Sequence, residues 1–328
     1  MVNLEAKYLG ITLKNPIVVS SSGLTNSVEK IGKLVNAGAG AVVLKSLFEE
    51  QINHEINNSI NSGEGFDYPE ALDYIKEYTK ENNVNDYLEL IKGAKEAYDI
   101  PVIASINCFS SGNWVEFAKK IQDAGADAIE LNVYVLNTDK NSKAEDYEEI
   151  YYDVLTSVKK EVSIPVVMKL GLYFSNLVRV VDMMSALGAA GVVLFNRFYE
   201  PDIDIHKLSV KPAEVFSSSA DLRRTLRWVA IVSDKVNQVD VAASTGIHSG
   251  EDVIKVLLAG ASAAQVCSAI YKNGPKVITQ MLEDIEKWME ENDFDTIDEF
   301  KAKMTYGNLE NPAHWERSQF MKYFSSLE

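Results

Sequence analysis

Cysteine and histidine are scarce in this chain, and neither has the spacing of a covalent or metal-binding framework. Among the 328 residues there are two cysteines, Cys108 and Cys267, and four histidines, at positions 54, 206, 248 and 314. Disulfide scaffolds and structural zinc sites need closely paired cysteine or cysteine and histidine positions. We therefore expect neither a disulfide framework nor a metal site, and we interpret both cysteines as small buried groups.

Basic residues and long apolar runs are also lacking. Lysine and arginine total 32 against 48 aspartates and glutamates, which gives a net charge of −16. This balance disfavours nucleic acid and anionic membrane as partners. No apolar run approaches the roughly 20 residues that span a bilayer, and the first residues lack a signal-peptide pattern. We expect a cytoplasmic protein with a small-molecule substrate, no nucleic acid and no membrane.

Short apolar runs alternate with amphipathic stretches along most of the chain. The runs are nearly all apolar, as in parallel strands that are buried on both faces. The stretches between them have apolar residues at helical spacing, for example at 115–124, 177–187, 222–236 and 251–259. The eight predicted strands are 16–20, 41–45, 101–106, 128–133, 165–170, 191–196, 239–243 and 263–268.

Four predicted helices end in nearly the same motif, with Gly38, Gly125, Gly188 or Gly260 just before the next strand. Glycine after a helix is typical of the joint from helix to strand in repeated units. The alternation predicts an α/β fold of the (β/α)8 TIM barrel type, with an open doubly wound sheet as the alternative. We expect one domain over residues 1–328: an N-terminal β-hairpin within 1–15 that plugs the barrel, a barrel over about 16–291 and a helical C-terminal extension, 292–328. Two long connections, 47–98 and 197–219, should lie on the C-terminal face.

Two lysines and several small polar residues follow the predicted strands. Lys45 and Lys169 lie in apolar strands, where an unpaired lysine is rare, so we interpret both as functional. Thr245-Gly246 and Ser249-Gly250 would let backbone N–H groups approach an anion such as phosphate. These small residues are equally typical of turns and helix caps, which leaves an ordinary structural role open.

The strand ends, taken in order, resemble those of the soluble dihydroorotate dehydrogenases. The fourth predicted strand continues as Glu-Leu-Asn-Val-Tyr-Val-Leu-Asn over residues 130–137. The other matching ends are Ser-Ser-Ser-Gly at 20–23, Lys-Ser at 45–46, Met-Lys-Leu at 168–170, Asn-Arg at 196–197, Ala-Ser-Thr-Gly-Ile at 243–247 and Gln-Val-Cys-Ser-Ala at 265–269. Each tripeptide is weak alone, but the ordered set covers roughly residues 1–305 and is specific.

The resemblance implies an FMN-dependent dehydrogenase that acts on CH–CH groups, with dihydroorotate as substrate in pyrimidine biosynthesis. It also implies a homodimer and a small anionic substrate. By resemblance, Lys45, Asn132, Asn137 and Asn196 line the substrate side and are the catalytic candidates. The FMN candidates are Ser21, Ser22, Gly23, Lys45, Ser46, Asn107, Asn132, Lys169, Asn196, Ser244, Thr245, Gly246 and Ser268.

Several positions depart from the family pattern. Val135 stands where the family has the cysteine that removes a proton from the substrate, and valine cannot take a proton. Tyr134, Asp139 and Glu200 are nearby residues that could replace it. The predicted substrate loop, 59–66, matches the family only at its start, and Arg197 is either an anion clamp or a loop residue. An FMN-binding protein without efficient catalysis, or a phosphate-binding lyase with a Schiff-base lysine, remains the alternative.

Overall fold

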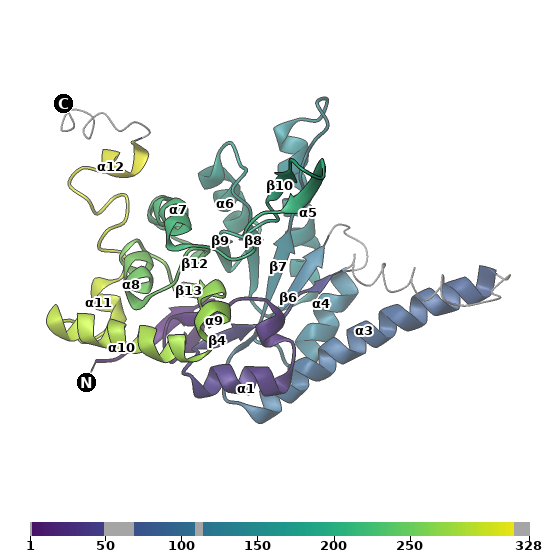
Figure 1. The fold of residues 1–328 in the computed structure, drawn as a ribbon, viewed down its shortest axis with the longest axis horizontal. Helices are drawn as coiled ribbons and strands as arrows, with labels where there is room; N and C mark the ends of the chain where they lie inside the picture. Colours follow the sequence, from purple (N-terminus) through teal and green to yellow (C-terminus); the bar gives the residue numbers. More distant parts are fainter. Residues whose placement is uncertain (1, 49–68, 109–113, 318–328) are drawn as a thin grey trace.

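The protein is a closed (β/α)8 barrel in a computed structural model that describes residues 2–48, 69–108 and 114–317 (Figure 1). Within these residues, eight parallel strands pair in a ring, and the β4–β6 pairing closes it. In ring order the strands are β3 (Ile17–Val19), β4 (Ala41–Val43), β6 (Val102–Cys108), β7 (Ala128–Val133), β8 (Val166–Leu170), β9 (Gly191–Leu194), β12 (Asp240–Ser244) and β13 (Ala263–Val266). All eight overlap the predicted strands, which confirms the barrel and excludes the open sheet.

Helices follow the strands and surround the barrel, as the periodicity predicts. They are α1 (Val28–Asn36), α3 (Pro69–Ala97), α4 (Trp114–Asp123), α5 (Ala144–Glu161), α6 (Leu177–Ala186), α7 (Leu222–Lys235), α8 (Gly250–Leu258), α9 (Ser268–Asn273) and α10 (Lys276–Glu291). The glycines predicted to end four of them have φ between 93° and 103°, a conformation that L-residues avoid. Local sequence therefore determines where these helices stop.

A hairpin of β1 (Ala6–Tyr8) and β2 (Ile11–Leu13) fills the amino end of the barrel. Its turn, Leu9-Gly10, has positive φ at both residues, the geometry favoured for two-residue hairpins. Tyr8, Leu9 and Leu13 are buried together with inward side chains of the barrel strands. The Leu9 amide also donates to Asp240 Oδ2 at 2.7 Å. The predicted plug is thus confirmed.

The two long connections contain structure of their own. Leu47–Phe48 (β5) pairs with β6, and α3 fills much of the first connection and projects beyond the barrel (Figure 1). The second connection contains an antiparallel hairpin, β10 (Pro201–Asp204) and β11 (Ser209–Pro212), that the sequence analysis did not predict. It is followed by the short turn η2 (Ser219–Asp221), while η1 (Gly23–Thr25) follows β3.

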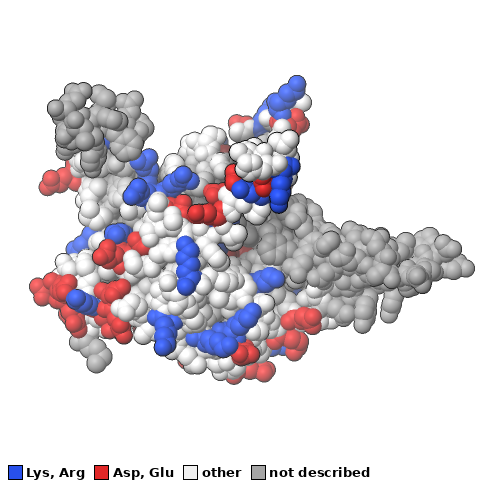
Figure 2. Space-filling model, viewed as in Figure 1, with Lys and Arg blue, Asp and Glu red and all other residues white. Residues whose placement is uncertain are grey.

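The described part of the C-terminal extension contains two short helices, α11 (Ile297–Phe300) and α12 (Ala313–Glu316). It packs on the outside of the barrel: Phe300 is fully buried, and the Met304 and Tyr306 amides donate to carbonyl groups of α8 and α7. Figure 2 shows acidic and basic side chains interspersed over the visible face. Among the described helices, none is long and apolar enough to cross a membrane.

Candidate functional site

The inward side chains of the barrel change from apolar to polar toward the carboxyl ends of the strands. One interior layer, packed on the plug, contains Val18, Val43, Ile103, Ala128, Val167, Val193, Ala242 and Ala263. Strand side chains alternate, so the residue two positions further along again points inward. These next residues are Ser20, Lys45, Ser105, Glu130, Lys169, Phe195, Ser244 and Gln265. Since Phe195 is the one apolar member, this layer forms a polar floor.

A buried hydrogen-bonded network forms the centre of this floor. Lys169 Nζ donates to Glu130 Oε1 at 3.2 Å and to Gln265 Oε1 at 3.0 Å, and Gln265 Nε2 donates to Glu130 Oε2 at 2.6 Å. Ser20 Oγ also donates to Gln265 Oε1 at 3.3 Å. Because β7 and β13 lie on opposite sides of the ring, the contact between Glu130 and Gln265 crosses the barrel. The charge of Lys169 is therefore compensated, while one of its three N–H donors has no partner among the described residues.

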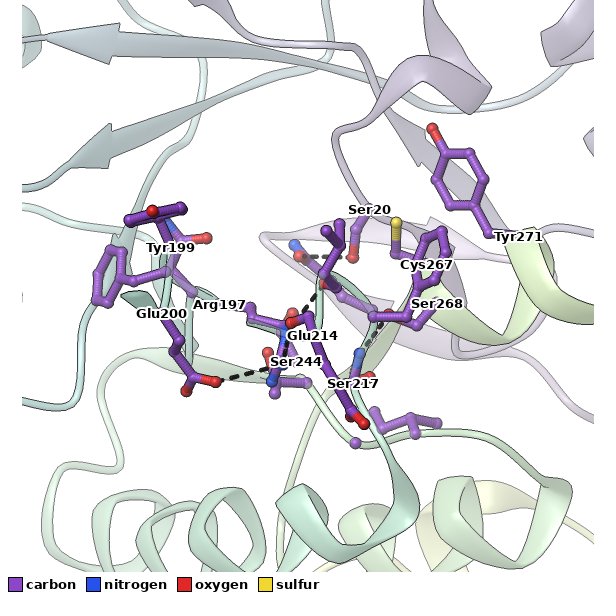
Figure 3. Close-up of a pocket in the computed structure, with 18 of the residues that line it drawn as sticks. Ser20, Arg197, Tyr199, Glu200, Glu214, Ser217, Ser244, Cys267, Ser268 and Tyr271 are labelled. Carbon is purple, nitrogen blue, oxygen red and sulfur yellow. Dashed lines mark hydrogen bonds and ion pairs between the residues drawn. The ribbon is translucent and has the colours of Figure 1, made fainter. Parts of the chain in front are cut away.

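A cavity of about 390 Å³ lies above this network. Figure 3 shows Arg197 and Glu214, from the connection that follows β9, beside Ser20 and Ser244 from the strand ends. The cavity brings together seven of the predicted site residues: Ser21, Lys169, Asn196, Ser244, Thr245, Gly246 and Ser268. These residues come from five different strand ends, so closure of the barrel brings them together at one cavity.

One side of the cavity has the features of a cradle for an anion. Thr245 and Gly246 both have positive φ, at 78° and 89°, and a Cβ on Gly246 would clash with the backbone nitrogen of Leu222. The Ser217 amide donates to Ser268 Oγ at 3.0 Å, and Ser217 Oγ lies 3.0 Å from His248 Nε2. Because of the close approach of Gly246 to Leu222, only glycine at position 246 allows the loop after β12 to pack directly on the start of α7.

Positive charge lies close to this cradle. Lys272 Nζ donates to the carbonyl oxygen of Ser217 at 2.8 Å. Burial, with a further contribution from Lys272, lowers the pKa of His248 below its usual value. By contrast, Ser249 caps α8 by accepting from the Asp252 amide, and Gly250 packs against Asp284. For Ser249-Gly250 the ordinary structural interpretation is therefore correct.

Four further FMN candidates lie beside the cavity rather than on its wall. Ser46 Oγ lies 3.0 Å from Ser21 Oγ and 2.7 Å from Ser105 Oγ, so a chain of hydroxyl groups extends from the cavity into the core. Ser22 caps η1 by accepting from the Leu24 amide. Gly23 lies so near Tyr271 that an added Cβ would be 2.9 Å from its hydroxyl oxygen. Lys45 is half-buried, and no partner for its ammonium group is found among the described residues.

The predicted asparagines do not all meet. Asn196 Nδ2 donates to Asn132 Oδ1 at 2.7 Å, and Asn132 is the cross-strand partner of Asn107. Asn107 Oδ1 is buried and has no hydrogen-bond partner in the part of the chain that is described. Asn137 instead lines a neighbouring cavity of about 370 Å³, together with Val135, and its side chain accepts from the Asp139 amide.

The residues weighed as anion clamp or replacement base have other partners. Arg197 donates to the carbonyl oxygens of Glu214 and Val215 and pairs with Glu200 and Asp221 at 3.5 Å, which supports its role as a loop residue. The Tyr134 ring stacks on Phe198, with centroids 3.8 Å apart. Asp139 lies in the second cavity. The predicted substrate loop, 59–66, lies outside the described residues.

Glu130 and Gln265 were not predicted as site residues. Both were part of matched motifs, and the signal was available: each is a polar residue in a mostly apolar strand. Such a residue is unusual in a core unless it is paired. What sequence could not give was the partner, because these strands are 135 residues apart.

The fold and this site define the class: a (β/α)8 barrel protein with a polar cavity, a buried lysine and small polar residues at the carboxyl ends of the strands. A sequence profile of dihydroorotate dehydrogenase matches residues 3–289. The chain therefore belongs to the dihydroorotate dehydrogenase family, a family of flavin-dependent oxidoreductases.

Individual relatives agree with this assignment. The catalytic subunit of dihydroorotate dehydrogenase B (NAD(+)) from Thermoplasma volcanium is 27% identical, over 91% of this chain and 97% of its own length. The corresponding subunit from Alkaliphilus metalliredigens is 28% identical, over 92% and 99%. The NAD-dependent dihydropyrimidine dehydrogenase subunit PreA of Escherichia coli is 24% identical, over 90% and 75%.

Proposed function

We propose that this chain binds FMN in the cavity at the carboxyl ends of its strands and catalyses a redox step on the CH–CH bond of a small anionic substrate. The observation that carries the proposal is Lys169. Its ammonium group is held on the cavity floor by Glu130 and Gln265, with one donor free for a ligand. Bound FMN would supply a hydride acceptor, which no side chain can provide.

The described residues fit FMN at two places. Thr245 and Gly246, with their positive φ, would hold the phosphate group through backbone N–H groups, and Ser268 would hold it with its hydroxyl group. Lys169 and Asn107 would face the ring: the ammonium would donate its remaining N–H to a ring acceptor, and the orphaned Asn107 Oδ1 would accept from an N–H donor. The remaining FMN candidates, Ser21, Ser22, Gly23, Ser46 and Ser244, would support these contacts.

The substrate would lie on the side of Lys45, Asn132 and Asn196. An ammonium without a described partner and a pair of hydrogen-bonded amides can bind an anion that also carries ring N–H or carbonyl groups. The relatives act, by their names, on dihydroorotate or on dihydropyrimidines, so we infer a substrate of this ring class. Asn137 would join them only if its loop, which now lines the second cavity, moved.

Dihydroorotate itself is the substrate that similarity suggests, but Val135 argues against efficient turnover. A placed general base contributes roughly 10²–10⁴ to the rate, and a valine contributes none of it. We therefore propose a cytoplasmic, homodimeric FMN oxidoreductase of the dihydroorotate dehydrogenase type. Either a residue other than Val135 takes the proton, or the substrate is not dihydroorotate.

The absorbance spectrum of the purified protein is the first test. We expect a flavin spectrum, or uptake of added FMN with a dissociation constant below that of riboflavin, because riboflavin lacks the phosphate group. Lys169→Met should weaken binding or change the spectrum of the bound flavin. A colourless protein that takes up no FMN would contradict the proposal.

An FMN-binding protein without efficient catalysis is the second candidate, and Val135 favours it. Photoreduction of the bound flavin, followed by mixing with candidate acceptors, separates the two functions. Rapid reoxidation by one small-molecule acceptor indicates the enzyme, and slow reoxidation by all of them indicates the binding protein. A Schiff-base lyase that uses Lys169 has less support, because this amine is already engaged by Glu130 at 3.2 Å and by Gln265 at 3.0 Å.

A further inference from the structure

Glu130 is a fully buried carboxylate at the centre of the barrel, with 0% of its surface exposed. Ionised groups are rarely buried unless they are paired, since burial of an unpaired charge costs several kcal/mol or more. Here each carboxylate oxygen has one partner: Oε1 accepts from Lys169 and Oε2 from Gln265. The hydrogen-bond requirement of the carboxylate is thus met entirely from the floor of the cavity.

The same contacts fix the position of the Lys169 ammonium. Lys169 is 6% exposed and Gln265 2%, so neither side chain has room to adopt another rotamer without breaking the network. Gln265 bridges the pair, because its Oε1 accepts from Lys169 while its Nε2 donates to Glu130. Below the network, Tyr8 of the plug has a raised pKa, caused by burial and then by the negative charge of Glu130.

We propose that Glu130 is a positioning residue that holds Lys169 at the cavity floor and cancels its positive charge, which lowers the reduction potential of a flavin bound above it. The inference rests on the proposed function. A flavin gains negative charge on reduction, and an uncompensated ammonium would stabilise the reduced form more than the oxidised form. A carboxylate 3.2 Å from that ammonium opposes this effect.

The potential of the bound FMN tests the inference. It is measured by reductive titration of the holoprotein against a reference dye. Glu130→Gln keeps the shape and a hydrogen-bonding group but removes the charge, so the potential should rise. A tenfold increase in the preference for reduced over oxidised FMN corresponds to about 30 mV for a two-electron couple. An unchanged or lower potential would overturn the proposal.

Asp127→Asn is the matched control. Asp127 precedes β7 at the opposite end of the barrel, pairs with Lys95 at 2.8 Å, and lines neither cavity. This variant loses the same unit charge from the same part of the chain, so a general effect of net charge would move its potential as well. We expect its potential to stay at the wild-type value, and an equal rise in both variants would overturn the role of Glu130.

A second variant keeps the test valid if Glu130→Gln fails to fold. The double variant Glu130→Gln with Lys169→Met removes both charges together and leaves no unpaired ion in the core. If Glu130 cancels Lys169, its potential should stay within about 30 mV of the wild type. A larger fall would show that the ammonium was uncompensated. If the wild type binds no FMN, the proposed function is overturned as well. If it binds FMN but the reduction potentials of the variants do not change as expected, this inference alone is overturned.

Discussion

At the scale of single residues, Val135 is the position where the proposed function departs most from ordinary dihydroorotate oxidation. It follows β7 by two residues and lines the second cavity, beside Tyr147 and Asn137. Its side chain has no lone pair and no exchangeable proton, so it can orient a substrate only by packing. The chemistry at this position is therefore testable by restoring a thiol.

Val135→Cys should raise dihydroorotate oxidation from a slow or undetectable rate. If the lost base is what limits the wild type, the gain should approach the roughly 10²-fold lower bound for a placed base. Steady-state turnover with an artificial electron acceptor measures it. Val135→Ala is the control, because it opens the same space without a thiol. An equal gain in both variants, or wild-type turnover already at the rate of an ordinary family member, would refute the explanation.

Cys267 reports on the cavity through its reactivity. It lines the cavity, and burial raises the pKa of its thiol above the usual value, against smaller opposing effects of Ser22 and Lys169. Only the thiolate reacts, so alkylation by iodoacetamide should be slow at pH 7 and should increase with pH through a midpoint above the ordinary one. Mass spectrometry of the Cys267 peptide measures this, and added FMN should slow it. Fast labelling at pH 7, unaffected by FMN, would contradict the cavity assignment.

Sequence predicted the individual side chains of the cavity better than their partners. Lys169 and Thr245 were singled out by local signals, a lysine within an apolar strand and a small polar residue after one, whereas Ser244 and Ser268 came from the family resemblance. The partners of Lys169 were not found, because a hydrogen bond across the barrel depends on strands that are far apart in sequence.

At the scale of elements, the loop that follows β12 packs closely against the start of α7. Gly246 allows the loop to approach the backbone of Leu222, and its φ of 89° is unfavourable for other residues. Gly125, which ends α4, has a similar φ of 97° but open space around it. The two glycines therefore separate the cost of backbone conformation from the cost of a clash.

Gly246→Ala should destabilise the protein more than Gly125→Ala. Placing an L-residue in this backbone region costs about 1–2 kcal/mol, which both variants share. Gly246→Ala adds overpacking against backbone, typically about 1–3 kcal/mol more, and should also weaken FMN binding. Urea unfolding measures the free energy of unfolding, and FMN titration the affinity. Equal losses in the two variants would show that the loop can move away from Leu222.

At the scale of the whole molecule, the hairpin of β10 and β11 has an unusual surface. Ile203 and Val210 are cross-strand partners on one face, 66% and 69% exposed, while Asp202 pairs with Lys211 on the other face. A two-stranded hairpin with a solvated apolar face is marginal alone and is typical of an interface. Since residues 201–212 carry two acidic and two basic side chains, this region adds no net repulsion between copies with a charge of −16.

If the chain is a homodimer, Ile203→Lys should shift it toward monomer. The added charge would have to be buried in the interface, which strongly disfavours association. Sedimentation velocity across a concentration series measures the equilibrium. Ser209→Lys, on the opposite face of the same hairpin, is the control and should leave the dimer intact. A dimer that resists Ile203→Lys would place the interface elsewhere, and a monomeric wild type would refute the homodimer.

By itself, the sequence determined the repeated β/α units, the glycines that end the helices and the polar character of the strand ends, because each depends on neighbouring residues and on local periodicity. Closure of the barrel decided which of those polar ends meet: it joined Glu130, Lys169 and Gln265 across the ring and left Asn137 beside a second cavity. Contacts between residues more than a hundred positions apart depend on how the strands close in space, and no local pattern encodes that.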